Sequence, residues 1–171
     1  MLHLFALALF SISNWVEYQS YGGKFRVVAP VEMEEKIDSV ETALGVLAYH
    51  VFYAAEEGEE TDNALYMVSY CDYPEGSIHS DSTELLAEFF EATMDQAAFS
   101  INGTLMYSDL SELDGFPGRM WRIDYKNKQA VIRTRAYVVN NRYYAVQVVS
   151  PYKRNLNAAV NRFLDSFQLL K

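Results

Sequence analysis

The stretch AVIRTRAYVVNNRYYAVQVV, residues 130–149, decides the fold. Its two halves are rich in Val, Ile, Tyr and Thr, the residue types that favour strands. Asn140 and Asn141 separate the halves, and asparagine tolerates the positive φ that a two-residue hairpin turn requires. The stretch therefore predicts two antiparallel strands, residues 130–139 and 142–149, whose side chains alternate between two faces.

Strand patterns continue on both sides of this hairpin. Apolar and aromatic runs bounded by Gly, Pro, Asn and acidic residues predict strands at 25–29, 46–55, 64–71, 105–113 and 119–125, and the polar segment 33–41, with Met33, Ile37 and Val40 spaced through it, predicts another. We expect residues 33–41 to lie at an edge, Gly115–Gly118 to form a turn, and residues 168–171 to add a last short strand.

Two amphipathic helices complete the predicted fold. The first begins at Asp81, which has Glu84 three residues on, as in a capping box, and it ends before Gly103. The second follows Ser150-Pro151, an N-cap residue and a proline at the first helical position. The predicted buried face of the first helix is Leu85, Leu86, Phe89, Phe90, Ala97, Ala98 and Ile101. The fold class is α+β, with a central seven- or eight-stranded antiparallel sheet and two main helices that cover it.

Composition and charge narrow the class of protein. The chain has 171 residues, of which 50% are hydrophobic and 22% charged, so it suits one globular domain. Cys71 is the only cysteine, which excludes an internal disulfide. Residues 1–113 contain 20 Asp+Glu and 3 Lys+Arg, whereas residues 114–171 contain 3 and 11. A net charge of −9 argues against general nucleic-acid binding, and we expect the two charged regions to interleave in one sheet.

Residues 1–13 differ from the rest of the chain. They form an apolar run that is too short to span a bilayer as a helix. The run fits the hydrophobic region of a secretory signal, and Ser11 and Ser13 are placed like the small residues of a cleavage site. We predict a signal peptide or N-terminal anchor at 1–13, with membrane association through it, and one domain at 14–171. The alternative is a buried N-terminal helix or strand in a cytoplasmic protein.

Two sets of charged residues are candidate sites. Converging arginines can hold an anionic ligand or an acidic peptide bidentately, and the alternative is ion pairing within the sheet. This ligand-binding candidate comprises Arg119, Arg122, Arg133, Arg135 and Tyr137. Carboxylates spaced along the first helix are the solvated face of that helix or a surface for a basic partner. This partner-binding candidate comprises Glu84, Glu88, Glu91 and Asp95.

The sequence contains no established catalytic pattern. Cys71 and His79 are the nearest Cys–His neighbours, with Asp72 and Asp81 beside them, but their spacing matches no known cysteine protease. A Gly-x-Ser-x-Gly elbow, metal-ligand pairs and a phosphate loop are absent from the sequence, so we expect no metal and no cofactor.

Several motifs together resemble the PsbP-like superfamily. They are Trp15…Tyr18…Gly23-Lys-Phe25-Arg-Val27…Pro30, then Gly115-Phe-Pro-Gly118, then Tyr137…Asn141-Arg-Tyr143-Tyr144, and Asn161-Arg-Phe163-Leu164-Asp-Ser166-Phe167. The resemblance covers nearly everything after residue 14 and is strongest to uncharacterised exported bacterial members. It implies an α/β/α sandwich on an antiparallel sheet, a fold shared by photosystem II extrinsic subunits and a Ran-binding nuclear transport factor. The motifs are structural, so the resemblance carries over no catalytic residue.

Three functions follow as hypotheses. The first is a non-catalytic exported module that binds a protein or a small ligand, as an accessory to a membrane-associated assembly. The second is an enzyme with a dispersed site near Cys71 and His79. The third is a cytosolic chaperone or trafficking adaptor that keeps its N-terminus.

Overall fold

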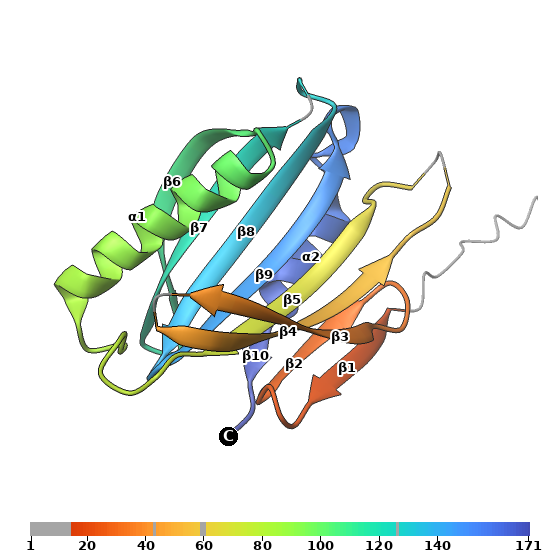
Figure 1. The fold of residues 1–171 in the computed structure, drawn as a ribbon. Coiled ribbons are helices and arrows are strands. Elements are labelled where there is room, and N and C mark those ends of the chain that lie inside the picture. Colours follow the sequence, from red (N-terminus) through yellow and green to blue (C-terminus); the bar gives the residue numbers. More distant parts are fainter. Residues whose placement is uncertain (1–14, 43, 59–60, 126) are drawn as a thin grey trace, which may run out of the picture.

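A seven-stranded antiparallel sheet forms the centre of the structure, a computed structural model that describes residues 15–42, 44–58, 61–125 and 127–171. The strand order is β3-β4-β5-β9-β8-β7-β6 (Figure 1). The hairpin at residues 130–149 supplies β8 and β9, and Asn140 in its turn has φ 56°, as predicted. The strands are β3 (Glu34–Thr42), β4 (Gly45–Ala55), β5 (Leu65–Asp72), β6 (Thr104–Leu113), β7 (Phe116–Tyr125), β8 (Ala130–Val139) and β9 (Arg142–Pro151).

Three shorter strands form a second sheet. β1 (Val16–Ser20) and β10 (Gln168–Leu169) both pair with β2 (Phe25–Ala29), so the end of the described chain returns to its beginning. Together with α2 (Ala158–Ser166) this sheet packs on one face of the main sheet and closes the larger hydrophobic core. The largest fully buried side chains of that core are Tyr66, Tyr144, Phe25, Phe52 and Phe163.

On the other face of the main sheet, α1 (Thr83–Ser100) packs on β6 and β7 (Figure 1). Strand alternation explains why there are two cores. Tyr143 and Ala145 of β9 belong to the α1 core, whereas Tyr144 and Val146 belong to the α2 core. The helices therefore lie on opposite faces, and the predicted α+β sandwich is confirmed.

The start of α1 differs from the prediction. Ser82, not Asp81, is the N-cap residue, and it makes no side-chain capping hydrogen bond, so the expected capping box is wrong. The buried stripe is Leu86, Phe90, Met94 and Ala98, which repeats every four residues. Leu85 is 43% exposed, because it lies one position off that stripe.

The start of α2 and the predicted turn at Gly115–Gly118 also differ from the prediction. Ser150 and Pro151 end β9, and the Ser150 hydroxyl is bound to buried Asn63 instead of capping a helix. Asn157 is the N-cap residue of α2, where its side-chain oxygen accepts a hydrogen bond from the Val160 amide at 3.1 Å. The turn at Gly115 is shorter than expected, since β7 already begins at Phe116.

The uneven charge follows from the sheet order. The basic region supplies β7, β8 and β9, and these strands lie between β5 on one side and β6 on the other, both from the acidic region. Arg142 of β9 and Asp72 of β5 form a two-bond ion pair across this boundary, at 2.6 Å for each bond. The predicted interleaving of the two regions is confirmed.

Candidate functional site

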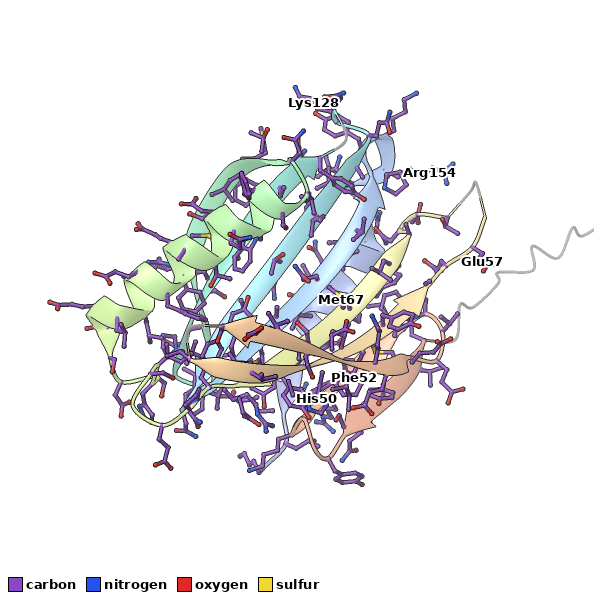
Figure 2. All side chains as sticks on the ribbon, in the orientation of Figure 1. His50, Phe52, Glu57, Met67, Lys128 and Arg154 are labelled. Atoms are coloured by element: carbon purple, nitrogen blue, oxygen red, sulfur yellow. The ribbon has the colours of Figure 1, made fainter. Side chains whose placement is uncertain are left out.

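A groove of about 450 Å³ lies between α1 and the main sheet. It is bordered by the helix on one side and by β4 and the loop after β5 on the other. Met67 lies on the same face, on the part of the sheet that α1 leaves open (Figure 2). The residues lining the groove are Tyr49, Ser69, Tyr73, Phe89, Ala92, Thr93, Gln96, Ala97, Ser100, Trp121, Tyr143, Ala145 and Gln147.

The groove exists because small side chains face each other across it. On the floor, Ala145 and Ser69 are direct cross-strand neighbours on β9 and β5, and the fully buried Ala136 of β8 continues their row next to the groove. On the helix, Ala92 and Ala97 face this row, so neither surface fills the space between them. A row of small residues in a sheet thus produces a hollow where helix and sheet would otherwise touch.

Larger side chains flank this small row on both sides. Trp121, Thr134 and Gln147 are neighbours across β7, β8 and β9, and form one flank. Tyr143, Cys71 and Tyr49 are neighbours across β9, β5 and β4, and form the other. The small residues of the floor therefore lie between Trp121 and Gln147 on one side and Tyr49 and Tyr143 on the other.

Aromatic rings form the rim at the Tyr143 end. Phe89 of α1 meets Tyr73 edge-to-face at 5.4 Å and Tyr143 edge-to-face at 5.5 Å, both between ring centroids. The hydroxyls of Tyr49 and Tyr73 share a hydrogen bond of 3.1 Å. Burial raises the pKa of Tyr49, Tyr73 and Tyr143 above the ordinary value for phenols, so all three stay neutral.

The groove wall carries no formal charge. None of the described residues that line it is Asp, Glu, Lys, Arg or His. Trp121 is 2% exposed, and its indole Nε1 is a buried donor without a hydrogen-bond partner. Buried donors are nearly always satisfied in folded proteins, so this one needs an explanation.

Cys71 and His79 do not form a catalytic pair. The Cys71 thiol is buried on the groove flank, and burial raises its pKa to about 11. His79 lies in an exposed turn with its Nδ1 3.4 Å from Asp81 Oδ2. Within the described chain no hydrogen bond joins the two side chains, and a thiol with this pKa stays protonated at neutral pH.

The arginine candidate site divides between the two faces of the sheet. Arg122 and Arg133 are direct neighbours on the α2 face, and both approach Asn155 Oδ1, at 3.5 and 3.3 Å. Arg122 is also paired with Asp124 at 2.7 Å. Arg119 lies opposite Ala136, on the α1 face.

Two members of this set are held by α2 and its C-cap residue, Phe167. Arg135 is paired with Asp165 of α2 at 2.7 Å. Tyr137 is buried and stacks on Phe167. The structure therefore does not bring all five residues together, and internal ion pairs hold two of the four arginines.

The carboxylates of the partner-binding candidate are exposed along α1. Exposure is expected both for a solvated helix face and for a surface that binds a basic partner. Glu84 and Glu88 line no described hollow. Glu91 and Asp95 line a second hollow of about 380 Å³ together with Arg119. The sequence did not predict that Arg119 lies beside these carboxylates. Elsewhere in the described chain no group of three or more His, Cys, Asp or Glu side chains is arranged to hold a metal ion.

Among the residues that the structure describes, no helix is long and apolar enough to cross a membrane. The predicted leader at 1–13 lies outside the described residues.

No model of a known protein family matches the chain, and no curated protein does. Among solved structures, cyanobacterial PsbP (CyanoP) from Synechocystis sp. PCC 6803 is similar over 97% of this chain and 98% of its own length, with a TM-score of 0.59. The chain has the PsbP-like fold. Sequence identity over the match is 9%, so the likeness confirms the predicted fold and carries nothing about activity.

Sequence analysis missed the groove altogether. Its floor is made by small residues in the middle of apolar strands. By residue type alone these cannot be told from other strand residues. The sequence did contain one indication of the groove, the small residues Ala92, Ala97 and Ser100 of α1, which line it. Seeing the groove required the strand register, which places Ala136, Ala145 and Ser69 side by side.

Proposed function

We propose that the protein is an exported, non-catalytic binding module that takes its ligand or partner in the groove between α1 and the sheet, as an accessory to a membrane-associated assembly. One observation carries this proposal: a hollow of about 450 Å³ with an uncharged, partly aromatic wall. Sites for small ligands are typically concave and mostly apolar, with a few polar groups, and measure roughly 300–1,000 Å³.

The chemistry of the wall supports binding without catalysis. General acid–base catalysis needs a group whose pKa lies near the working pH, and the lining residues provide phenols whose pKa values are raised. The Cys71 thiol is buried beside the groove, and its pKa of about 11 leaves it protonated. The second hypothesis, an enzyme that uses Cys71 and His79, gains no support from this geometry.

Export is supported by the apolar run at residues 1–13. N-terminal sequencing of the protein from its native source tests it. We expect a new N-terminus near residue 14. An intact Met1 on the mature protein would remove the argument for export and favour the cytosolic adaptor.

Two tryptophan substitutions on α1 test the groove itself. Ala92 lines the groove, whereas Ala87 is exposed on the same helix and does not line it. Wild type, Ala92→Trp and Ala87→Trp are expressed in the native host, purified from the envelope fraction at near-physiological salt and analysed by native mass spectrometry. We expect a co-purifying ligand or partner on wild type and Ala87→Trp, and its loss from Ala92→Trp. Equal retention by all three proteins would show that the groove is not the binding site, and an absence of any partner would count against a binding function.

A further inference from the structure

Arg133 of β8 is a half-buried arginine that forms no ion pair within the described chain. It lies directly opposite Arg122 on the α2 face of the sheet, and like charges in directly opposed positions destabilise a pair of strands. Asp124 relieves only Arg122, from which it accepts two hydrogen bonds at 2.7 and 3.2 Å. Two guanidiniums and one carboxylate therefore leave an uncompensated positive charge at this point of the sheet.

The guanidinium of Arg133 uses few of its hydrogen-bond donors. Nη2 donates to Asn155 Oδ1 at 3.3 Å, whereas Nε is buried and has no partner among the residues that the structure describes. The other buried donor of this kind, Trp121 Nε1, is enclosed in the core on the opposite face. Nη1 of Arg133 makes no hydrogen bond with the described chain and is not a buried atom, so a ligand can reach it. An unpaired charged donor costs free energy, and an acceptor from outside the chain would recover it.

Asn155 lies between the two arginines and is 9% exposed. Arg122 Nη1 and Arg133 Nη2 both donate to its Oδ1, at 3.5 and 3.3 Å, which is long for hydrogen bonds from a cation. Its Nδ2 donates to the Tyr152 carbonyl, and this bond fixes the orientation of the amide. One neutral oxygen thus serves two cations, which receive a dipole where an anion would supply a charge.

The surroundings of this pair are also basic. Residues 120–139 and 150–157 contain 7 Lys+Arg, and Asp124 is their one acidic residue. The Tyr152 amide, in the short helix η1 (Tyr152–Arg154), donates to the Gln129 carbonyl at 2.9 Å, so η1 lies against the turn between β7 and β8. Lys128 of this turn and Arg154 of η1 lie at the same end of the sheet (Figure 2). In a protein with a net charge of −9, this end favours an anionic ligand.

We propose that Arg122 and Arg133 bind a phosphate group beside Asn155, on the α2 face of the sheet. A tetrahedral phosphate has oxygens for both guanidiniums at once, whereas a planar carboxylate pairs with one of them. Its charge of about −1.5 to −2 at neutral pH also suits a basic surrounding better than the single charge of a carboxylate. The site lies on the opposite face from the groove, so this inference is independent of the proposed function.

Inorganic phosphate and acetate are the probes that test the ligand class. Each is titrated at constant ionic strength into the full chain labelled with ¹⁵N, and the arginine Nε–Hε signals are followed by two-dimensional NMR. We expect phosphate to shift the signals of Arg122 and Arg133 until they saturate. We expect acetate to bind at least about tenfold more weakly, because it lacks the oxygens that reach the second guanidinium.

Three substitutions locate the site. Arg133→Gln removes the unpaired guanidinium and should weaken phosphate binding at least about tenfold, the contribution of one hydrogen bond from a charged group. Arg162→Gln is the matched control, because it removes the same charge from an exposed position on α2, where the guanidinium lies over the Trp15 ring. It should change phosphate binding by less than about twofold, since salt screens distant charges. Asn155→Asp supplies a carboxylate between the two arginines and should abolish phosphate binding.

Thermal unfolding distinguishes a ligand site from a structural contact. Without phosphate, Arg133→Gln should be at least as stable as the wild type, because it removes both the repulsion with Arg122 and an unpaired buried donor. Phosphate should raise the melting temperature of the wild type and of Arg162→Gln, but not that of Arg133→Gln.

Four results would each overturn the proposal. They are the absence of a saturable shift with phosphate, equal binding of acetate, unchanged phosphate binding by Arg133→Gln, and a clear loss of stability in Arg133→Gln without the anion. Vesicles identify the source of the phosphate group. Sedimentation with phosphatidylcholine vesicles that contain phosphatidic acid, lost in Arg133→Gln, would assign a lipid headgroup. Binding of inorganic phosphate without binding to these vesicles would assign a soluble phosphate compound, and either result supports the site.

Discussion

Substituting Gly118 with alanine should destabilise the protein strongly, because the sheet leaves no space for a methyl group there. Gly118 lies opposite Tyr137, where β7 pairs with β8. A Cβ at this position would lie 2.4 Å from the Ala136 carbonyl oxygen and 2.5 Å from Tyr137 Cδ1. Both neighbours are fixed, since β8 is paired on its other side with β9 and the Tyr137 ring stacks on Phe167.

The expected magnitude follows from these distances. Real Cβ atoms essentially never approach another atom within 3.0 Å, so β7 and β8 would have to separate by about 0.6 Å at this point. Overpacking of this kind costs about 1–3 kcal/mol, and the backbone oxygen of a central strand places Gly118→Ala at the upper end, about 3 kcal/mol. For a domain of this size that corresponds to a melting temperature lower by about 6–12 °C.

Gly22→Ala is the matched control for Gly118→Ala. Its added Cβ would meet only the Tyr70 hydroxyl at 3.7 Å, an ordinary contact. We expect its free energy of unfolding to change by less than about 1 kcal/mol, since alanine also restricts the unfolded chain. Urea and thermal unfolding of both variants measure the difference. If Gly118→Ala is as stable as Gly22→Ala, the close packing of β7 against β8 described above is refuted.

Three further predictions concern individual side chains. Cys71 should react slowly with iodoacetamide at pH 8, because its thiol is buried and has a pKa of about 11. Arg142→Gln should flatten the loss of stability below about pH 4. The hydrogen bonds from Arg142 hold the pKa of Asp72 below its ordinary 3.8, so this stabilisation is present above that pH and is lost as the pH falls. Tyr144→Phe removes the hydroxyl that donates to the Gly23 carbonyl at 2.7 Å, and should lower the free energy of unfolding by about 1–3 kcal/mol.

Each of these measurements has its own control. Cys71 should label fully once urea unfolds the chain, and rapid labelling of the native protein would contradict its burial. Parallel acid titrations of wild type and Arg142→Gln, followed by circular dichroism, would argue against the Asp72 interaction if the two curves have the same shape. Tyr21→Phe, in an exposed position of the same turn as Gly23, should leave stability unchanged. A loss as large as that of Tyr144→Phe would mean that the buried hydrogen bond is not the cause.

The main sheet could be predicted because its evidence is local. Period-two alternation and the Asn140 turn lie within 20 residues, and they specify a hairpin without knowledge of the rest of the chain. The three-stranded sheet could not be recognised as separate, because its middle strand pairs residues that are 142 apart in sequence, such as Arg26 and Gln168. Local pattern shows that a segment is extended but not which neighbour it joins.

Helix starts were less predictable than helix positions. Asp81 and Ser150 both carry the side chains of N-cap residues, yet neither caps a helix. Ser150 is held by Asn63, which lies 87 residues away and also bonds to Asn157, the true N-cap residue. A buried polar network that links three loops in this way is not visible in any single segment of sequence.

The arginine set shows the same limit at the level of a site. Residues 133, 135 and 137 alternate along β8 and therefore share one face. Arg119 and Arg122 are three residues apart on β7 and therefore lie on opposite faces, so they cannot converge on one ligand. Parity within a strand could have separated them before the structure was known. The ion pairs with Asp124 and Asp165 could not have been foreseen, because they depend on where α2 packs.

The sheet order also explains how the two edge strands of the main sheet are protected from pairing with another chain. Both edge strands of the main sheet, β3 and β6, come from the acidic region of the chain. β3 carries four carboxylates against one lysine, and β6 carries two carboxylates and no basic residue. An edge strand exposes backbone groups that another chain can join, and like charges on the approaching edges oppose that pairing. The basic strands lie in the middle of the sheet, where neighbours already occupy both sides. The uneven charge is thus explained as protection of the sheet against pairing with another copy, and the uncharged groove remains the surface that we propose for a ligand.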